Sequence, residues 1–361
     1  MRAVRELELV GGGRKVMLSK IISDFGPVIA VEEIMPRLVV AKRLVVTRRF
    51  AVAALSIFAL AGAIRNAAAE DTLKVAIPQK GAWDAGIAEL GQRGGFFKKH
   101  GLNLDILYTT AGPESIQAMI GGSIDVAVAS GVSAAIGTFG KGAPIRIISS
   151  EMTGAPDLYW FVPADSPIKT IQDMNDKTVA FSAIGSSSHG SLLALIAQYH
   201  LTAKPTATGN IASTITQTMT KQVDVGFGAA PFGLDLVESG KARIIATGND
   251  VAALRTRAVR VNLTGANTLQ TRHDVLVRFM QAYKETVDWM YSNPEALKVY
   301  GEYSGLPDAI VQRVIKLIPK EALQTDEVKG INDIMTDAVA QKFLSAPLTP
   351  DQLKELIQIQ K

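Results

Sequence analysis

The sequence of 361 residues contains no cysteine, only four histidines and only three tryptophans. Without cysteine, disulfide frameworks, thiolate zinc sites and cysteine nucleophiles are excluded. The HExxH, GxSxG, Walker and GxGxxG patterns are also absent, so these markers of metalloproteases, hydrolases and nucleotide-binding proteins are missing. Apolar residues make up 47% of the chain, which is enough to bury the cores of two domains or of one large α/β unit.

Positive charge is concentrated in the first 69 residues of the chain. This segment holds 11 of the 38 Lys and Arg residues but only 5 of the 34 acidic ones, a net charge of +6. The remaining 292 residues hold 27 basic and 29 acidic side chains, a net charge of −2. A slightly acidic body gives no electrostatic basis for binding a polyphosphate, so we expect no nucleic-acid partner.

An uncharged run, Phe50 to Ile64, follows a basic segment and precedes three small residues that end at Ala69. This order is typical of a secretory signal peptide. A membrane-spanning helix needs about 20 apolar residues, so the run is short for the alternative, an uncleaved anchor helix. We predict that residues 1–69 form a signal peptide region, that cleavage occurs near Ala69 and that the mature protein lies in the periplasm.

The predicted signal peptide lies unusually far from residue 1. Met35, followed by Pro36 and Arg37, supplies a normal start for the basic segment. We therefore expect translation to begin at Met35 or later, and residues 1–34 not to be translated. Thr47-Arg48-Arg49 is a weak twin-arginine signal, so the choice between Sec and Tat export stays open.

From Leu73 onward, short strands rich in β-branched residues alternate with amphipathic helices. This alternation is typical of α/β units with parallel strands. The first predicted strands cover residues 74–77, 102–108, 124–129 and 145–149. Helices are predicted within 87–91 and from Pro113 to Gly121.

The same order of elements recurs about a hundred residues later in the chain. When Asp125 is aligned with Asp224, Ile116 falls on Ile215 and Ile124 on Val223. The second set comprises strands and helices over 178–181, 191–199, 215–221, 223–227 and 242–247. Two similar halves predict two lobes joined by two crossings, near 157–173 and at a strand over 258–263. The predicted boundaries are 70–157 and 259–361 for lobe I, and 158–258 for lobe II.

Several segments, in a fixed order, resemble a known family. They are RGGFFKKHGL at 93–102, GGSIDV at 121–126, SPIKTIQDM at 166–174 with KTVA at 177–180, and DVGF at 224–227 followed by Pro231-Phe232. At these segments the chain resembles the periplasmic substrate-binding proteins of ABC importers, in the nitrate, sulfonate, taurine and thiamine-precursor group. The resemblance covers nearly all of residues 72–357. Asn175-Asp176 departs from it, since the family usually has Lys-Gly in this surface turn.

The resemblance implies a type II periplasmic binding protein fold, in which two α/β lobes are joined by two crossover segments with a ligand cleft between them. It implies a protein that captures a small organic anion, of sulfonate or carboxylate type, and delivers it to an ABC transporter permease in the inner membrane. A thiamine-precursor pyrimidine or another aromatic solute is the alternative ligand. We expect a monomer without cofactor or bound metal. An enzyme on the same fold is disfavoured, because the chain lacks cysteine and catalytic motifs.

Ligands of open α/β sheets bind beyond the carboxyl ends of the strands, where helices begin. Ser186, Ser187 and Ser188 stand at such a place, and their hydroxyl and amide groups suit an anion. In the resembling family this loop contributes to the ligand site. Trp83 as a core residue, Asp84 as a helix cap and His189 as a packing residue fit the sequence as well as a ligand role does. The other predicted ligand-binding residues are Gln79, Trp83, Asp84, Gly112, Ser130, Gly131, Glu151, His189, Phe227 and Phe232.

Overall fold

The computed structural model describes residues 70–360. The predicted signal peptide, its cleavage near Ala69 and the expected start at Met35 lie outside the described residues. Within residues 70–360, no helix is both long enough and apolar enough to span a membrane.

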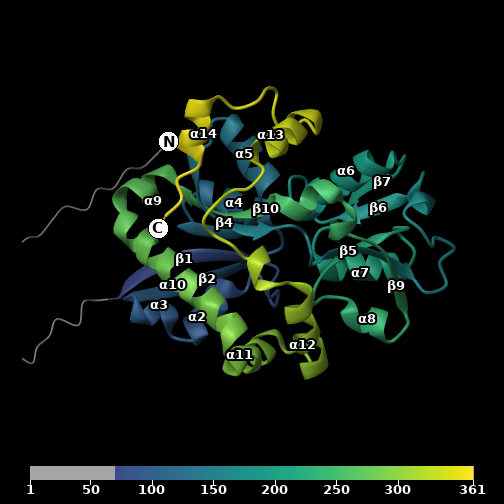
Figure 1. Cartoon of the computed structure of the whole chain (residues 1–361), viewed down its shortest axis with the longest axis horizontal. Helices are drawn as coiled ribbons and strands as arrows, with labels where there is room; N and C mark the ends of the chain where they lie inside the picture. Colours follow the sequence, from purple (N-terminus) through teal and green to yellow (C-terminus); the bar gives the residue numbers. More distant parts are fainter. Residues whose placement is uncertain (1–69, 361) are drawn as a thin grey trace, which may run out of the picture. The chain divides into compact units, whose positions relative to one another are not determined.

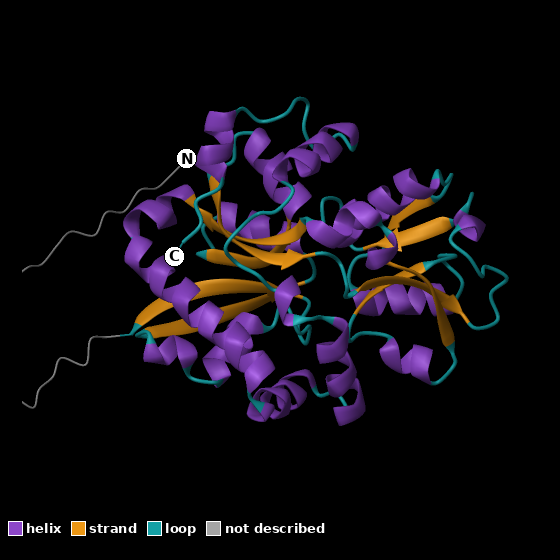
Figure 2. Ribbon diagram, viewed as in Figure 1, coloured by secondary structure: helices purple, strands orange, loops and turns teal. Residues whose placement is uncertain are grey.

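One sheet of five strands is built from the beginning of the described chain and from one later strand (Figures 1 and 2). Its order is β2-β1-β3-β10-β4. β1 pairs in parallel with β2 and β3, whereas β10 runs antiparallel between β3 and β4. The strands are β1 (Asp71–Pro78), β2 (Leu102–Thr109), β3 (Val126–Gly131), β4 (Ile145–Thr153) and β10 (Ala258–Gly265).

The remaining strands repeat this topology. β8, β5 and β9 form one sheet, β6 and β7 form another, and a parallel bridge from Val179 to Val225 links them. The combined order β7-β6-β8-β5-β9 matches that of the first sheet, with β5 as the antiparallel strand. These strands are β5 (Leu158–Pro163), β6 (Thr178–Phe181), β7 (Lys204–Ala207), β8 (Gly226–Ala229) and β9 (Ala242–Thr247).

The two aligned aspartates occupy equivalent places in the two halves. Asp125 accepts a hydrogen bond from the Lys74 backbone N–H at 2.8 Å, and Asp224 accepts one from the Thr178 backbone N–H at 2.8 Å. Each carboxylate therefore fastens the segment before one strand to the first strand of its own half. The repeat predicted from the sequence has a structural counterpart in these bonds.

Helices cover both faces of the five-stranded sheet. Leu73, Val75 and Ile77 pack on one face in a core with α2, α3 and α10, whereas Ala76 packs on the other face with α4, α5 and α13. Alternate residues of a strand point to opposite faces, so β1 serves both cores. The helices are α2 (Ile87–Arg93), α3 (Phe96–Lys99), α4 (Gly112–Ile120), α5 (Val132–Gly140), α6 (Ser187–Tyr199), α7 (Ile211–Met219), α8 (Leu234–Glu238), α9 (Ala266–Thr271), α10 (His273–Ser292), α11 (Pro294–Ser304), α12 (Asp308–Leu317), α13 (Ile331–Ala340) and α14 (Pro350–Leu356).

Some elements differ from the sequence-based expectations. Residues 158–163, assigned to a crossing, form β5 at the centre of the second sheet. α6 begins at Ser187 instead of Ser191, because the Ser186 side chain accepts a hydrogen bond from the His189 backbone N–H and caps the helix. β7 was not predicted, since it is a mostly exposed edge strand that contains Pro205 and lacks an apolar alternation.

Candidate functional site

A cavity of about 520 Å³, open solvent included, lies at the loops that follow β1, β2, β3 and β6. The carboxyl end of β8 and the start of β5 complete its wall, so both sets of strands contribute. This placement agrees with the rule that ligands bind beyond the carboxyl ends of parallel strands. Nine of the predicted ligand-binding residues line it: Gln79, Asp84, Gly112, Gly131, Ser186, Ser187, Ser188, Phe227 and Phe232.

Helix α11 positions the loop after β1. The Gly81 backbone N–H donates to Tyr303 Oη at 2.9 Å, and Tyr300 Oη donates to the Gly81 carbonyl at 2.9 Å. Gln79 donates from Nε2 to the Thr110 carbonyl at 2.8 Å, which ties this loop to the one that follows β2. The loop thus presents Asp84 to the cavity from a fixed backbone.

The loop before α6 is held by its own serines. Ser186 Oγ accepts from the His189 backbone N–H at 3.2 Å and lies 3.0 Å from Ser188 Oγ. Ser188 Oγ also accepts from the Ser182 backbone N–H at 3.0 Å. The hydroxyls of Ser186 and Ser188 therefore organise the helix start. Ser187 Oγ instead accepts from Arg260 Nε at 3.1 Å.

Two glycines allow the loops to approach each other closely. A Cβ atom at Gly131 would lie 2.7 Å from the Gly185 carbonyl oxygen and 2.8 Å from the Ser187 nitrogen. A Cβ atom at Gly112 would lie 3.1 Å from the Ser130 Cα. Gly131 ends β3 and Ser187 begins α6, so the absence of a side chain at Gly131 sets the spacing between the two halves here.

Arg260 on β10 lies at the centre of the buried charges. Its Nη1 donates to Asp84 Oδ2 at 3.0 Å and its Nη2 to Asp157 Oδ2 at 2.7 Å. The side chains are nearly inaccessible, with exposed fractions of 7% for Arg260, 5% for Asp84 and 1% for Asp157. Burial alone lowers the pKa of Arg260, but the adjacent charges of Asp157 and Asp84 outweigh it and raise that pKa above its ordinary value.

The acidic groups around Arg260 outnumber it. Burial raises the pKa of Asp84, and the attraction of Arg260 lowers it only in part. Burial also raises the pKa of Glu151 well above its usual value, and the charge of Asp84 adds to this rise. Neither Glu151 carboxyl oxygen has a hydrogen-bond partner within residues 70–360.

In this part of the chain, no group of three or more acidic or histidine side chains is arranged to hold a metal ion.

Four predicted residues do not line the cavity. Trp83 is fully buried, makes edge contacts with Tyr291 and Tyr300 and donates from Nε1 to Tyr291 Oη at 2.9 Å. It is a core residue of the first half. Ser130 and Glu151 are buried within β3 and β4, where the strands extend further than the sequence indicated.

His189 is the fourth of these residues. Its ring stacks on Phe181 with centroids 4.1 Å apart, and its Nδ1 accepts from the Gly185 backbone N–H at 3.1 Å. Burial lowers the pKa of His189 to about 4, which agrees with an acceptor role for Nδ1. The ring thus packs against the loop that carries Ser186, Ser187 and Ser188, which we call the serine loop.

Sequence reasoning missed the central pair, Arg260 and Asp157. Both carried a signal. Arg260 is a charged residue within the apolar strand Ala258–Leu263, and Asp157 directly precedes the apolar run 158–163. A charge inside a buried strand needs a partner of opposite sign, which points to a second buried charge elsewhere in the chain.

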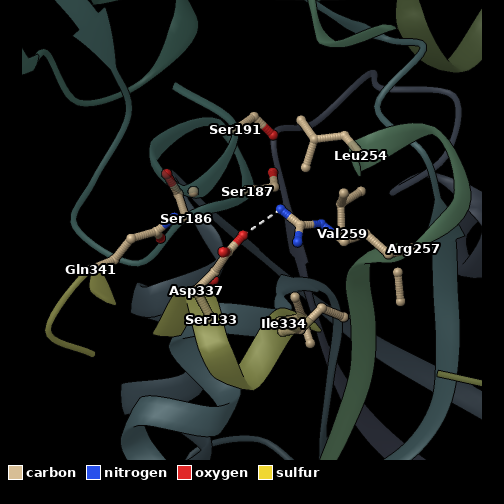
Figure 3. Close-up of a pocket in the computed structure, with 13 residues that line it drawn as sticks. Ser133, Ser186, Ser187, Ser191, Leu254, Arg257, Val259, Ile334, Asp337 and Gln341 are labelled. Atoms are coloured by element: carbon tan, nitrogen blue, oxygen red, sulfur yellow. Dashed lines mark hydrogen bonds and ion pairs between the residues drawn. The ribbon is translucent and has the colours of Figure 1, made fainter. Parts of the chain in front are cut away.

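A second, smaller cavity shares Ser186 and Ser187 with the first (Figure 3). It lies among the starts of α5 and α6, the helix α13 and the segment that leads into β10. Arg257 Nη2 donates to Asp337 Oδ2 at 2.6 Å across it, as the dashed line in Figure 3 shows. Ser186 and Ser187 therefore border both cavities.

The sequence is similar to a known protein family. Residues 88–297, more than half of the chain, match the family described as NMT1/THI5 like. No curated protein sequence matches the chain.

Solved structures of periplasmic binding proteins share the fold. The alkanesulfonate-binding protein SsuA from Xanthomonas axonopodis pv. citri, bound to MOPS, aligns with a TM-score of 0.65 and 20% identity over 76% of this chain and 92% of that one. The periplasmic aliphatic sulphonate-binding protein SsuA from Escherichia coli aligns with a TM-score of 0.64 and 18% identity over 80% and 92% of the two chains. The periplasmic nitrate-binding protein NrtA from Synechocystis PCC 6803 aligns with a TM-score of 0.62 and 13% identity over 80% of this chain and 86% of that one. The predicted periplasmic binding protein fold is confirmed.

Proposed function

Since the chain belongs to the NMT1/THI5-like family, we propose that it is an extracytoplasmic solute-binding protein. It captures a small organic solute and delivers it to the permease of an ABC importer in the inner membrane. The signal peptide predicted for residues 1–69 supports a periplasmic location. We further propose that the protein acts as a monomer and releases its solute chemically unchanged.

The observation that carries this proposal is the composition of the cavity wall. Gln79, Asp84 and Gly131 come from the first half of the chain, whereas Ser187 and Phe227 come from the second. A solute in this cavity contacts both halves at once. Such a site is suited to retention, because closing the halves around the solute removes it from water.

We propose that the halves are the two lobes predicted from the sequence and that they move about the two crossings. These crossings run from β4 to β5 and from β9 to β10. A solute favours the closed arrangement only by the difference between its affinities for the closed and open forms. The permease then recognises the closed form.

The cavity contains features that favour different ligands. The N-terminus of α6 favours an anion, in line with the sulfonate or carboxylate ligand predicted from the sequence. Asp84 and Asp157 oppose it, because they place more negative than positive charge beside the cavity. An apolar wall that includes Phe227 and Phe232 suits the alternative, an aromatic solute with hydrogen-bond donors. We therefore favour the second class.

No catalytic role is proposed for His189 and the serines that precede it. The His189 ring is bonded to the Gly185 backbone and stacked on Phe181. A general base for a serine nucleophile has to lie within hydrogen-bond reach of its hydroxyl. Nδ1 of His189 already accepts from the Gly185 N–H, and no hydrogen bond joins the ring to a serine hydroxyl within residues 70–360.

The proposal is tested with protein purified without denaturation from the periplasm. Its bound solutes are released by unfolding in urea, and the refolded protein is mixed with the extract. We expect the extract to raise the melting temperature and to reduce the radius of gyration measured by X-ray scattering. An extract and a broad solute panel that both leave melting and scattering unchanged would contradict the proposal.

A further inference from the structure

We propose that the cavity is built for a cationic solute with N–H donors, an ammonium or amidinium group on a compact apolar body, and that Asp157 receives that group. This inference rests on the proposed function and narrows the class of solute. It follows from three observations: the balance of buried charge, the occupied donors of Arg260 and a vacant carboxylate oxygen.

The first observation is the sign of the buried charge. Asp84 and Asp157 bring two carboxylates to the cavity wall, and Arg260 is the one cationic side chain among the described residues that line it. Glu151 lies nearby, but burial raises its pKa well above its usual value, so it supplies no counter-charge to the site. A sulfonate or carboxylate entering this site would place a further negative charge in a desolvated, acidic surrounding, which is costly. A single positive charge on the solute balances the site.

The second observation is that Arg260 has little left to offer an anion. A guanidinium has five N–H donors. Nε donates to Ser187 Oγ at 3.1 Å, and Nη2 donates to Asp157 Oδ2 at 2.7 Å. Nη1 donates to Asp84 Oδ2 at 3.0 Å and to Met152 Sδ at 2.9 Å. Four of the five donors are therefore occupied. A bidentate anion would have to break contacts that already neutralise the buried carboxylates. Arg260 is therefore part of the wall and not a free anion receptor.

The third observation is the vacant oxygen of Asp157. Its side chain is 1% exposed, it lines the cavity, and its Oδ1 has no hydrogen-bond partner within residues 70–360. Buried carboxylate oxygens are strong acceptors that are normally satisfied. An N–H group of a solute satisfies this atom, whereas an anionic group repels it.

The other wall of the cavity suits the apolar part of such a solute. Leu158, Ile211, Phe227 and Phe232 line it. The hydroxyls of Ser186 and Ser188 contact each other and accept backbone N–H groups within their own loop, so they stabilise the start of α6. A solute with one cationic end and one apolar end matches both walls.

The test uses refolded, solute-free protein and probes that each carry one six-membered aromatic ring but differ in charge. Benzylamine and benzamidine are the cations, benzoate and benzenesulfonate the anions, and 4-aminopyrimidine is a neutral donor-bearing ring. Unfolding is done in urea, because guanidinium belongs to the proposed ligand class. We expect the cations to raise the melting temperature and to bind in calorimetry, and the anions to do neither.

The variant Asp157→Asn keeps the shape of the side chain and removes its charge. We expect it to weaken cation binding about tenfold to a hundredfold, the range for a hydrogen bond to a charged group. Asp165→Asn, at an exposed carboxylate paired with Lys221, is the matched control and leaves the affinity unchanged. If Asp157→Asn does not fold, Asp84→Asn takes its place with the same expectation.

The outcomes separate this inference from the proposed function. Binding of an anion, or cation binding that is equal in Asp157→Asn and the wild type, overturns the inference but leaves a solute-binding protein. Binding of 4-aminopyrimidine alone also overturns it, since the positive charge is then unnecessary. If neither these probes nor the periplasmic extract bind, both proposals fall.

Discussion

Arg260 and Asp157 form a buried ion pair in which Nη2 donates to Oδ2 at 2.7 Å. The two residues lie far apart in the sequence but next to the two crossings, since Asp157 directly precedes β5 and Arg260 lies near the start of β10. Ser187 at the start of α6 joins the same guanidinium. The Arg260 side chain on β10 thus forms hydrogen bonds both to the crossing that carries Asp157 and to the start of α6 in the second half.

This pair leads to a prediction about stability. Arg260→Gln leaves Asp84 and Asp157 buried without a positive partner, which should lower the free energy of unfolding by about 3–5 kcal/mol. Urea unfolding at pH 7, followed by tryptophan fluorescence, measures this loss. Arg313→Gln is the control, because its ion pair with Glu238 is over one third exposed on both sides and should contribute about 0–1 kcal/mol. Equal losses in the two variants would contradict the central position of Arg260.

Gly131 gives a prediction about the contact between the halves. Gly131→Ala places a methyl group within 2.7 Å of the Gly185 carbonyl oxygen, so the two loops must separate. We expect solute affinity to fall at least tenfold, about 1.4 kcal/mol. Calorimetry with any solute that binds the wild type checks this. Gly301→Ala, whose added methyl would lie 3.9 Å from its nearest neighbour, should bind as the wild type does. Unchanged affinity in Gly131→Ala would show that this contact does not shape the site.

Glu151 gives a prediction about pH. Burial raises the pKa of Glu151 in the folded state, so ionising this side chain lowers the stability of the fold. The stability is therefore complete below the pKa of the unfolded chain and is lost as the pH rises through the pKa of the folded state. Glu151→Gln removes this loss without changing the shape of the side chain. The variant should match the wild type near pH 4 and melt at a higher temperature at pH 8. A melting temperature below that of the wild type at pH 8 would indicate that the carboxylate is ionised and stabilising.

His189 gives a second prediction about pH, in which stability is lost as the pH falls. Its pKa falls from 6.5 to about 4 on folding, so the unfolded chain takes up the proton first as pH falls. Stability is complete above pH 6.5 and declines toward pH 4. Because the ring is only partly buried, we expect a loss on the order of 1 kcal/mol between pH 7 and pH 5. His189→Gln should flatten this decline in urea unfolding, whereas His273→Gln, at the exposed start of α10, should retain it. A decline that persists in His189→Gln would assign it to another group.

The sequence predicted the elements whose signals are local. Alternating apolar residues marked β2, and the aligned Asp125 and Asp224 marked the repeated strand entry, because side-chain spacing and capping act over a few residues. The edge strand β7 was missed because neither of its faces is well buried. β5 was assigned to a crossing because an apolar run does not show which sheet it joins.

The position of the cavity was predicted from a topological rule, but side-chain packing decides which of the predicted residues line it. Gln79 and Ser187 follow strands, Gly131 is the last residue of one, and all three line the cavity, as the rule requires. Trp83 obeys the same rule but turns into the core, because Tyr291 and Tyr300 provide a partner for its ring and its N–H group. Arg260 and Asp157 are 103 residues apart in the sequence, and no local pattern specifies such a pair.

The central claim is that the cavity captures a small solute and releases it unaltered. The most direct measurement is to identify by mass spectrometry the solute released from natively purified protein and to titrate it into the refolded chain by calorimetry. The account predicts one solute per chain, weaker binding by Asp157→Asn and recovery of the same compound after prolonged incubation. Conversion of the solute into another compound, or the absence of stoichiometric binding, would contradict it.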